Sequence, residues 1–182
     1  MKTTARRLES VQEYYFSRKL REVAARVKAG QPIINMGIGS PDLPAHPSVI
    51  SALEKALPHP RAHMYQSYQG LPELREGISD FYKTHYQVAL DPNSEVLPLM
   101  GSKEGIMHIS MAFLNPGDQV LIPNPGYPTY AAVTRLMEAE AVCYELAERN
   151  HWQPDFTALE KFDTSKVKIM WVNYPHMHTG TD

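Results

Sequence analysis

The stretch QVLIPNPGYPTY, residues 119–130, passes from an apolar run into a turn that contains three prolines and one glycine. A short apolar run that ends in such a turn is typical of a buried strand. Residues 129–138 have the pattern of a helix, and AVCYE at 141–145 is predicted as the next strand. Strand, helix and strand in this order form the repeating unit of a parallel α/β sheet.

The same alternation extends to both sides of this unit. EVLPLM at residues 95–100 is predicted as an earlier strand, with a helix over 103–114 behind it. A short helix over 155–162 precedes the last predicted strand, VKIMWV at 167–172. Four strands with short turns between them predict an α/β fold around a mostly parallel sheet.

The residues before this region predict helices. Ser10 and Glu13 have the spacing of a capping box for a first helix, which Gly30 ends. A second helix opens at Pro47, and a third begins near Pro72. Each helix has apolar residues at helical intervals, which gives it one apolar face.

Composition excludes several classes of protein. The 182 residues include 18 Lys and Arg against 20 Asp and Glu, so we expect no nucleic-acid partner and no polybasic membrane anchor. No apolar run approaches the roughly 20 residues of a membrane span. Cys143 is the single cysteine, which excludes an internal disulfide and favours a reducing, cytoplasmic compartment. Because it lies in a predicted strand, we expect it to be poorly exposed as a nucleophile.

Ligands of parallel sheets bind at the carboxyl ends of the strands, which directs attention to the loops there. In GSKEG at 101–105, the Ser102 hydroxyl, the Lys103 ammonium and the first N–H groups of a helix suit a phosphate. The same residues also fit a plain helix start, with Ser102 as N-cap and Lys103 in solvent. The spacing is not that of a Walker loop.

Three further residues have two interpretations each. Tyr127, in its stiff turn, either stacks on a flat ring or covers the core. Gly39 either allows backbone to approach a ligand closely or only forms a turn. Arg75 is expected to be a solvated residue of the third helix.

Other kinds of site are disfavoured. His59 and His63 lie in a segment broken by proline, and His176 and His178 have no cysteine and no carboxylate close by except Asp182. We therefore expect no metal site. No G-x-S-x-G elbow occurs, and no G-x-G-x-x-G follows a strand, which argues against a generic nucleotide-binding domain.

Five stretches, in their order and at about their spacing, resemble the successive blocks of class I/II aminotransferases, which are fold-type-I enzymes dependent on pyridoxal 5′-phosphate. They are GIGSPDLP, YQSYQGLPELR, MGSKEGI, PNPGYPTY and NYPHMHTG. The resemblance implies the three-layer αβα large domain of that fold, with an incomplete mixed or parallel sheet and an N-terminal helical arm. Residues 1–45 would be the arm and part of the small domain, and 46–182 the first part of the cofactor-binding large domain.

The resemblance also implies a role for each matched residue. Ser102 and Lys103 would hold the cofactor phosphate, and Tyr127 would stack on the pyridine ring. Tyr65 matches a tyrosine that reaches the phosphate of the partner subunit across the family's homodimer. Gly39 matches the backbone position near the substrate carboxylate.

Two departures from the family are visible. Met177 and His178 stand where the family has Asn-Pro, and methionine cannot donate the asparagine's hydrogen bond to the cofactor. The family's Asn-Pro bond is typically cis, and without proline a cis bond costs about 3–4 kcal/mol. The lysine that attaches the cofactor is also unassigned, since Lys166 and Lys168 flank the start of a strand, at the wrong end of the sheet.

The expected function is therefore the transfer of an amino group between an amino acid and a 2-oxo acid, with this chain as an N-terminal fragment that is inactive alone. The alternative is a non-catalytic binding module, or a half-chain completed by a partner polypeptide. Missing strands would leave apolar sheet edges exposed. We therefore expect the isolated chain to be poorly soluble, or ordered only by assembly.

Overall fold

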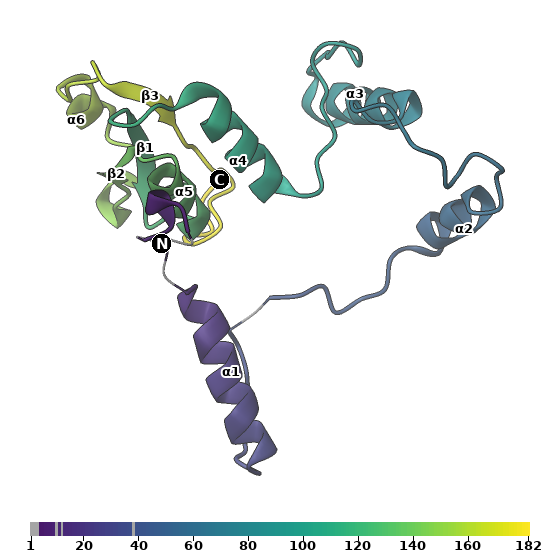
Figure 1. The fold of residues 1–182 in the computed structure, drawn as a ribbon, viewed down its shortest axis with the longest axis horizontal. Coiled ribbons are helices and arrows are strands. Elements are labelled where there is room, and N and C mark those ends of the chain that lie inside the picture. The colour runs from purple at the N-terminus through teal and green to yellow at the C-terminus, as the bar shows by residue number, and fades with distance from the viewer. Residues whose placement is uncertain (1–3, 10, 12, 38) are drawn as a thin grey trace. The chain divides into compact units, whose positions relative to one another are not determined.

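The computed structural model describes residues 4–9, 11, 13–37 and 39–182 (Figure 1). These residues form two compact units. One unit, the sheet unit, contains Leu99–Asp182 and the described residues among the first twelve. The other, the helical unit, contains Glu13–Pro98. The predicted domain limits of 1–45 and 46–182 stay a prediction.

The sheet unit is built on three parallel strands in the order β2-β1-β3. They are β1 (Gln119–Asn124), β2 (Glu140–Glu145) and β3 (Val167–Met170). β1 lies in the centre, and its residues Val120, Leu121 and Ile122 are buried. An uninterrupted apolar run suits such a strand, because helices cover both faces of a parallel sheet. The predicted parallel sheet is confirmed.

Two helices cover one face of the sheet and a third covers the other. Val120 and Ile122 pack with Ile106 of α4 (Ser102–Phe113) and Tyr130 of α5 (Pro128–Leu136). Leu121 alternates to the opposite face, where residues of and next to α6 (Phe156–Glu160) pack on it. Two short 3-10 turns, η1 (Arg6–Leu8) and η2 (Glu148–Asn150), complete this unit. The arrangement is the predicted three-layer αβα sandwich.

The first of the four predicted strands is wrong. EVLPLM at 95–100 has no strand geometry, and its Leu97 and Leu99 side chains are exposed. A strand is stable only when its backbone N–H and C=O groups pair with a neighbour. No described segment supplies that neighbour, and the division between the two units falls inside this stretch, after Pro98.

The helical unit contains α1 (Tyr15–Lys28), α2 (Pro47–Ala56) and α3 (Pro72–Tyr86), close to the predicted bounds. The predicted capping box begins at Ser10, which lies outside the described residues. Prolines at the first position open α2 and α3, where a missing N–H costs nothing. Within 13–37 and 39–98, only Arg75 is buried, so the apolar faces of these helices are not covered.

Arg75 corrects an expectation, because it is not solvated. It is 6% exposed, and its guanidinium donates to the backbone carbonyls of Gly70 at 2.9 Å and Pro92 at 2.8 Å. The planar fork of donors joins the loops before and after α3. Periodicity alone places Arg75 on the exposed face of the helix. The two loops nevertheless cover its side chain.

None of the described helices is long and apolar enough to cross a membrane. The residues described also contain no cluster of three His, Cys, Asp or Glu side chains that would hold a metal ion.

Candidate functional site

Three of the predicted stretches lie close together at the carboxyl edge of the sheet. β1 ends at Asn124 and leads through the turn 125–127 into α5, and β3 leads into the loop 171–182. Parallel strands place both loops at one edge. The start of α4 joins them, because the Lys103 Nζ lies 5.7 Å from the centre of the Tyr127 ring.

The start of α4 has the geometry of an anion site. Gly101 occupies the N-cap with φ at 102°, a conformation that favours glycine, and Ser102 is the first helical residue. The alternative with Ser102 as N-cap is therefore wrong. The Glu104 side chain accepts from the Met100 N–H, and the Glu104 N–H donates to the Gly101 carbonyl at 3.2 Å. The exposed Ser102 hydroxyl, the Lys103 ammonium and the N–H groups of Ser102 and Lys103 remain available to an anion.

Tyr127 is held in place by the turn before it. A Cβ on Gly126 would lie 2.2 Å from the Pro123 carbonyl oxygen, so only glycine fits between Pro125 and Tyr127. The half-buried Tyr127 is the N-cap residue of α5. This close approach explains why the turn has glycine at this position.

The Tyr127 ring belongs to a cluster of aromatic rings that extends into the core. It meets Tyr130 edge-on, with centroids 5.8 Å apart and planes at 85°. Tyr130 in turn stacks on Trp171 at 5.2 Å and 9°. The two interpretations of Tyr127 are thus compatible, because one edge packs on core aromatics while the ring remains partly exposed.

The charge of Lys103 acts on the same ring. A side-chain hydrogen bond with Thr129, and after it the Lys103 ammonium, hold the pKa of Tyr127 below its usual value. A cation over an aromatic face at a partly exposed site contributes about 0.5–1 kcal/mol. Lys103 is therefore exposed but does not point freely into solvent.

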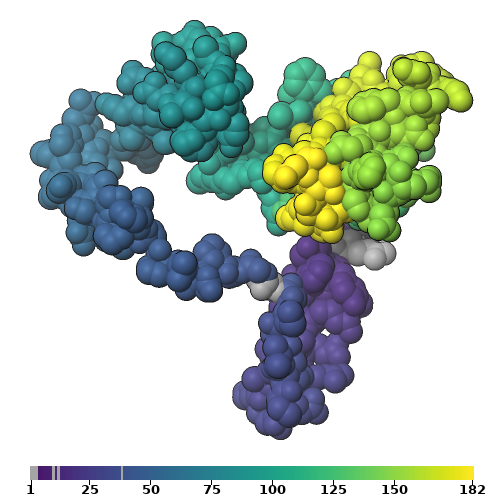
Figure 2. Space-filling model, turned by 180° about the vertical axis from the view of Figure 1, so that it is seen from behind, coloured from purple at the N-terminus to yellow at the C-terminus, as the bar shows by residue number. Residues whose placement is uncertain are grey.

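The loop after β3 lies against the surface of its own unit, where Figure 2 shows residues 171–182 in yellow beside the green residues. The Tyr174 hydroxyl donates to the Trp152 carbonyl at 2.6 Å, and His176 is buried. Met177 and His178, which replace the family's Asn-Pro, are exposed. The cis bonds of the described residues precede Pro125 and Pro175, so the Met177–His178 bond is trans.

His176 is the residue of this edge that the sequence interpretation missed. From the sequence alone, it is only one of two loop histidines to weigh as metal ligands. It is 2% exposed, and the Pro125 carbonyl in the turn after β1, which is distant in sequence, acts on its ring; no local pattern indicates that contact.

Other predicted residues lie elsewhere. Tyr65, which is fully exposed, and Gly39 belong to the helical unit, and their expected roles stay predictions. Lys166 immediately precedes β3, and Lys168 lies within its first half. Both are at the amino-terminal part of the strand, away from the edge that carries Tyr127.

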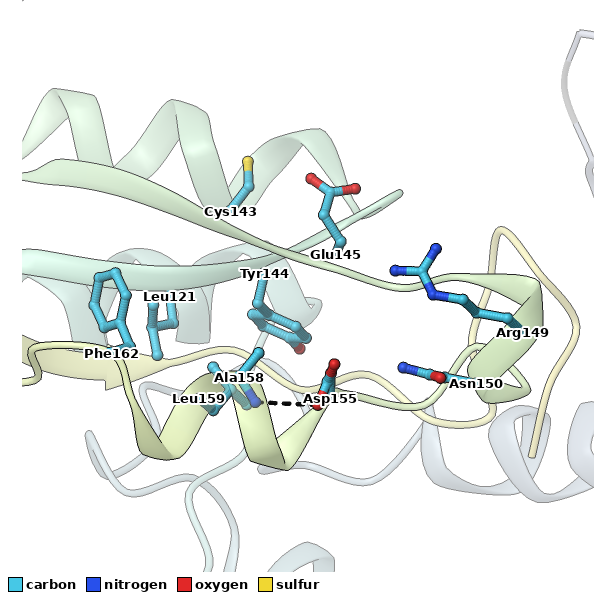
Figure 3. A pocket seen from close by; sticks show the side chains of 10 residues that line it. All are labelled: Leu121, Cys143, Tyr144, Glu145, Arg149, Asn150, Asp155, Ala158, Leu159 and Phe162. Carbon is cyan, nitrogen blue, oxygen red and sulfur yellow. Dashed lines mark hydrogen bonds between the residues drawn. The ribbon is translucent and has the colours of Figure 1, made fainter.

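A cavity of about 240 Å³ lies on the other face of the sheet, between β2 and α6 (Figure 3). Leu121, Leu159 and Phe162 line its apolar part, and it contains none of the predicted site residues. Cys143 also lines it and is exposed, which corrects the expectation of a covered thiol. The physical reason is that β2 is an edge strand of the three, so its outer residues lack cover.

The chain resembles known proteins over nearly all of its length. It is 40% identical to an LL-diaminopimelate aminotransferase of Dehalococcoides mccartyi over 176 residues, which is 97% of this chain and 45% of the relative. A second LL-diaminopimelate aminotransferase, from Oleidesulfovibrio alaskensis, is 44% identical over 98% of this chain and 46% of the relative. The chain thus spans about half the length of the curated relatives it matches.

Solved structures agree with this match. Apo BacF from Bacillus subtilis superposes with a TM-score of 0.87 at 38% identity, over 97% of this chain and 45% of BacF. The family model for aminotransferase class I and II matches residues 31–182. Because the match covers far more than half of its residues, the chain belongs to the class I and II aminotransferase family, whose enzymes depend on pyridoxal 5′-phosphate.

Proposed function

We propose that this chain supplies the phosphate-binding and ring-stacking part of an aminotransferase site, at which an amino group moves between an amino acid and a 2-oxo acid. The observation that carries the proposal is the convergence of Lys103, at the start of α4, on the Tyr127 ring. Pyridoxal 5′-phosphate, when bound, supplies an electron sink for the bond changes at the substrate's α-carbon. The relatives' activity as LL-diaminopimelate aminotransferases supports the same reaction class.

Each of these residues at the carboxyl edge of the sheet has a geometry that fits one role in binding the cofactor. The Ser102 hydroxyl and the N–H groups of the first turn of α4 donate to the phosphate, and Lys103 balances its charge. Tyr127 offers the ring face for stacking, at a position fixed by its turn and by Tyr130. An anion and a flat aromatic ring are thus held by groups that α4 and β1 place together.

Met177 is expected to weaken this binding. Its thioether does not donate a hydrogen bond, and its side chain is exposed rather than directed into the edge. We infer that the 3-hydroxyl oxygen of the cofactor receives no hydrogen bond from this position. Replacement Met177→Asn is expected to restore one donor.

We further propose that amino transfer needs residues outside these 182. The lysines next to β3 lie at the amino-terminal part of the strand, and Lys103 is engaged with the phosphate end of the site. The chain corresponds to less than half of its relatives' length, which supports the same view. A family-typical homodimer through Tyr65 and a cytoplasmic location belong to this proposal.

A second candidate function is a non-catalytic half that a partner polypeptide completes. The observation that favours it is the exposure of apolar side chains on all three helices of the helical unit. Surface of this kind marks an interface in many proteins. A completed site would then use Ser102 and Tyr127 from this chain and a lysine from the partner.

Pyridoxine 5′-phosphate tests the binding half of the proposal, because it has the phosphate and the ring but no aldehyde to react with surface lysines. Calorimetric titration should show binding that Ser102→Ala weakens about tenfold, the loss of a hydrogen bond to a charged group. Tyr127→Leu should weaken it about three- to tenfold through lost stacking. Ser17→Ala and Tyr86→Leu, exposed positions in the helical unit, are matched controls. Equal affinity in all four variants contradicts the proposal.

Borohydride reduction with pyridoxal 5′-phosphate tests the catalytic half. With no lysine suitably placed, peptide mapping should find scattered, substoichiometric labelling of lysines. Stoichiometric labelling of one lysine, together with transfer of an amino group to a 2-oxo acid, would assign the complete reaction to this chain.

A further inference from the structure

His176 is a buried titratable group that the cofactor contacts leave unexplained. It is 2% exposed, whereas Met177 beside it is 59% exposed and His178 is also exposed. Within residues 171–182 it is the one buried side chain. A histidine at this depth in a surface loop needs packing and hydrogen bonds that offset its desolvation.

The end of the chain folds around this imidazole. The His176 N–H donates to the Thr181 carbonyl at 2.6 Å, and the His176 carbonyl accepts from the Gly180 N–H at 2.8 Å. The ring Nδ1 lies 2.8 Å from the Thr179 hydroxyl oxygen. Residues 176–181 thus form a closed turn with the ring at its centre.

The other side of the ring faces the turn after β1. The Pro125 carbonyl acts on the imidazole, although Nε2 makes no hydrogen bond of ordinary geometry with any described group. Pro125 lies two residues before Tyr127. The buried ring therefore lies beside the turn that carries the stacking tyrosine.

We propose that His176 is a positioning residue, whose neutral ring holds loop 173–182 against turn 124–127 and so fixes Tyr127 beside the start of α4. The effect on cofactor stacking rests on the proposed function, whereas the position of Tyr127 does not. His176 touches no reacting atom and acts through the turn.

Protonation works against this contact. Burial, and after it the charge of His178, hold the pKa of His176 below its usual value near 6.5, while the Pro125 carbonyl acts in the opposite direction. The Tyr174 ring, 5.8 Å away, is the other titratable neighbour in the loop, and no described carboxylate acts on the ring. The folded state favours the neutral ring, so this stabilisation is full above pH 6.5 and is lost as pH falls through the folded pKa.

Near-ultraviolet circular dichroism of the full chain between pH 5 and 8 provides the test, because Trp171, Tyr130 and Tyr127 form one stack. In the wild type, the aromatic signal should fall with a midpoint below 6.5. His176→Asn, which keeps hydrogen-bonding groups but does not titrate, should hold the signal constant over this range. The control His178→Ala should retain the transition. A transition of unchanged midpoint in His176→Asn overturns the proposal.

Binding of pyridoxine 5′-phosphate at pH 7.5 gives the second readout. His176→Ala should weaken it about tenfold, and His176→Asn should stay within twofold of the wild type. If His176→Ala fails to fold, the pH profile of His176→Asn decides. If the wild type does not bind the probe but His176→Asn abolishes the transition, the positioning role stands and the proposed function fails. Unchanged affinity and signal in a folded His176→Ala overturn the positioning role.

Discussion

The helices of the sheet unit and of the helical unit all have apolar residues along one face. Only the sheet unit has a core of buried apolar side chains. Val120 at the centre of the sheet is 0% exposed, whereas Leu53 on the apolar face of α2 is 62% exposed. Both residues obey the periodicity of their element. The difference shows that an apolar stripe stabilises a protein only when a second surface covers it.

The helical unit is ordered by polar contacts instead. Arg75 joins the loops on both sides of α3, and the Ser79 hydroxyl donates to the Leu90 carbonyl at 2.6 Å. These bonds fix local geometry but remove little apolar surface from water. We therefore expect the two units to differ strongly in their response to substitution.

The largest expected effect sharpens this contrast. Val120→Asp places an unpaired charge in the sheet core and should cost more than about 4 kcal/mol, enough to unfold the unit. Leu53→Asp on the exposed face of α2 should change stability by less than about 0.5 kcal/mol. Hydrogen exchange followed by mass spectrometry of the two units checks this. Comparable loss of protection in both variants would show that α2 is covered after all.

Arg75→Met is expected to have the next largest effect. It leaves the half-buried Gly70 and Pro92 carbonyls without their donor, which should cost about 1–3 kcal/mol in total because water can partly replace the lost bonds. Exchange should rise around residues 69–70 and 92–93 and stay unchanged in β1. Arg26→Met, which breaks an exposed pair with Glu22 within α1, is the control and should cost less than about 0.5 kcal/mol.

The stability of the chain at alkaline pH tests a buried tyrosine of the sheet unit. Burial raises the pKa of Tyr144 to about 12, and its hydroxyl donates to the Trp171 carbonyl at 2.7 Å. The folded pKa is above the unfolded value near 10, so this stabilisation is present below pH 10 and is lost as pH rises toward 12. A difference of two units between the folded and the unfolded pKa corresponds to about 2–3 kcal/mol of folding free energy. Urea unfolding at pH 9 and 11.5 should show most of this loss in the wild type. Tyr144→Phe should show a smaller loss, because burial also raises the pKa of Tyr130 and of Tyr174.

Substitutions on the exposed faces of the helical unit should have the smallest effect on the free energy of folding. They should change the self-association of the chain instead. The chain is expected to be poorly soluble or to assemble, because Leu53 and Phe81 lie on uncovered apolar faces. Leu53→Glu with Phe81→Glu should raise the monomer fraction in sedimentation. A sharp, cooperative thermal transition of a wild-type monomer would contradict the expectation.

Much of the site followed from the sequence, because its residues lie in short blocks with their own turn chemistry. Ser102 and Lys103 open a helix after glycine, and three prolines and a glycine indicate the stiff turn that holds Tyr127. The close approach that requires glycine at position 126 comes from the structure. The roles of Tyr65 and Gly39 depend on a partner subunit and a substrate, so they remain predictions.

Periodicity and turn residues predict the position of nearly every helix and of β1, β2 and β3, because both are local properties of the chain. Which elements are buried or paired depends on contacts between segments that are distant in the sequence. EVLPLM at 95–100 has a strand's composition but no neighbour, Arg75 is buried by two loops, and Cys143 is exposed on an edge strand. His176 is buried, and the Pro125 carbonyl, some fifty residues earlier in the chain, acts on its ring. Burial and pairing each need a second surface, and no local pattern specifies which one it will be.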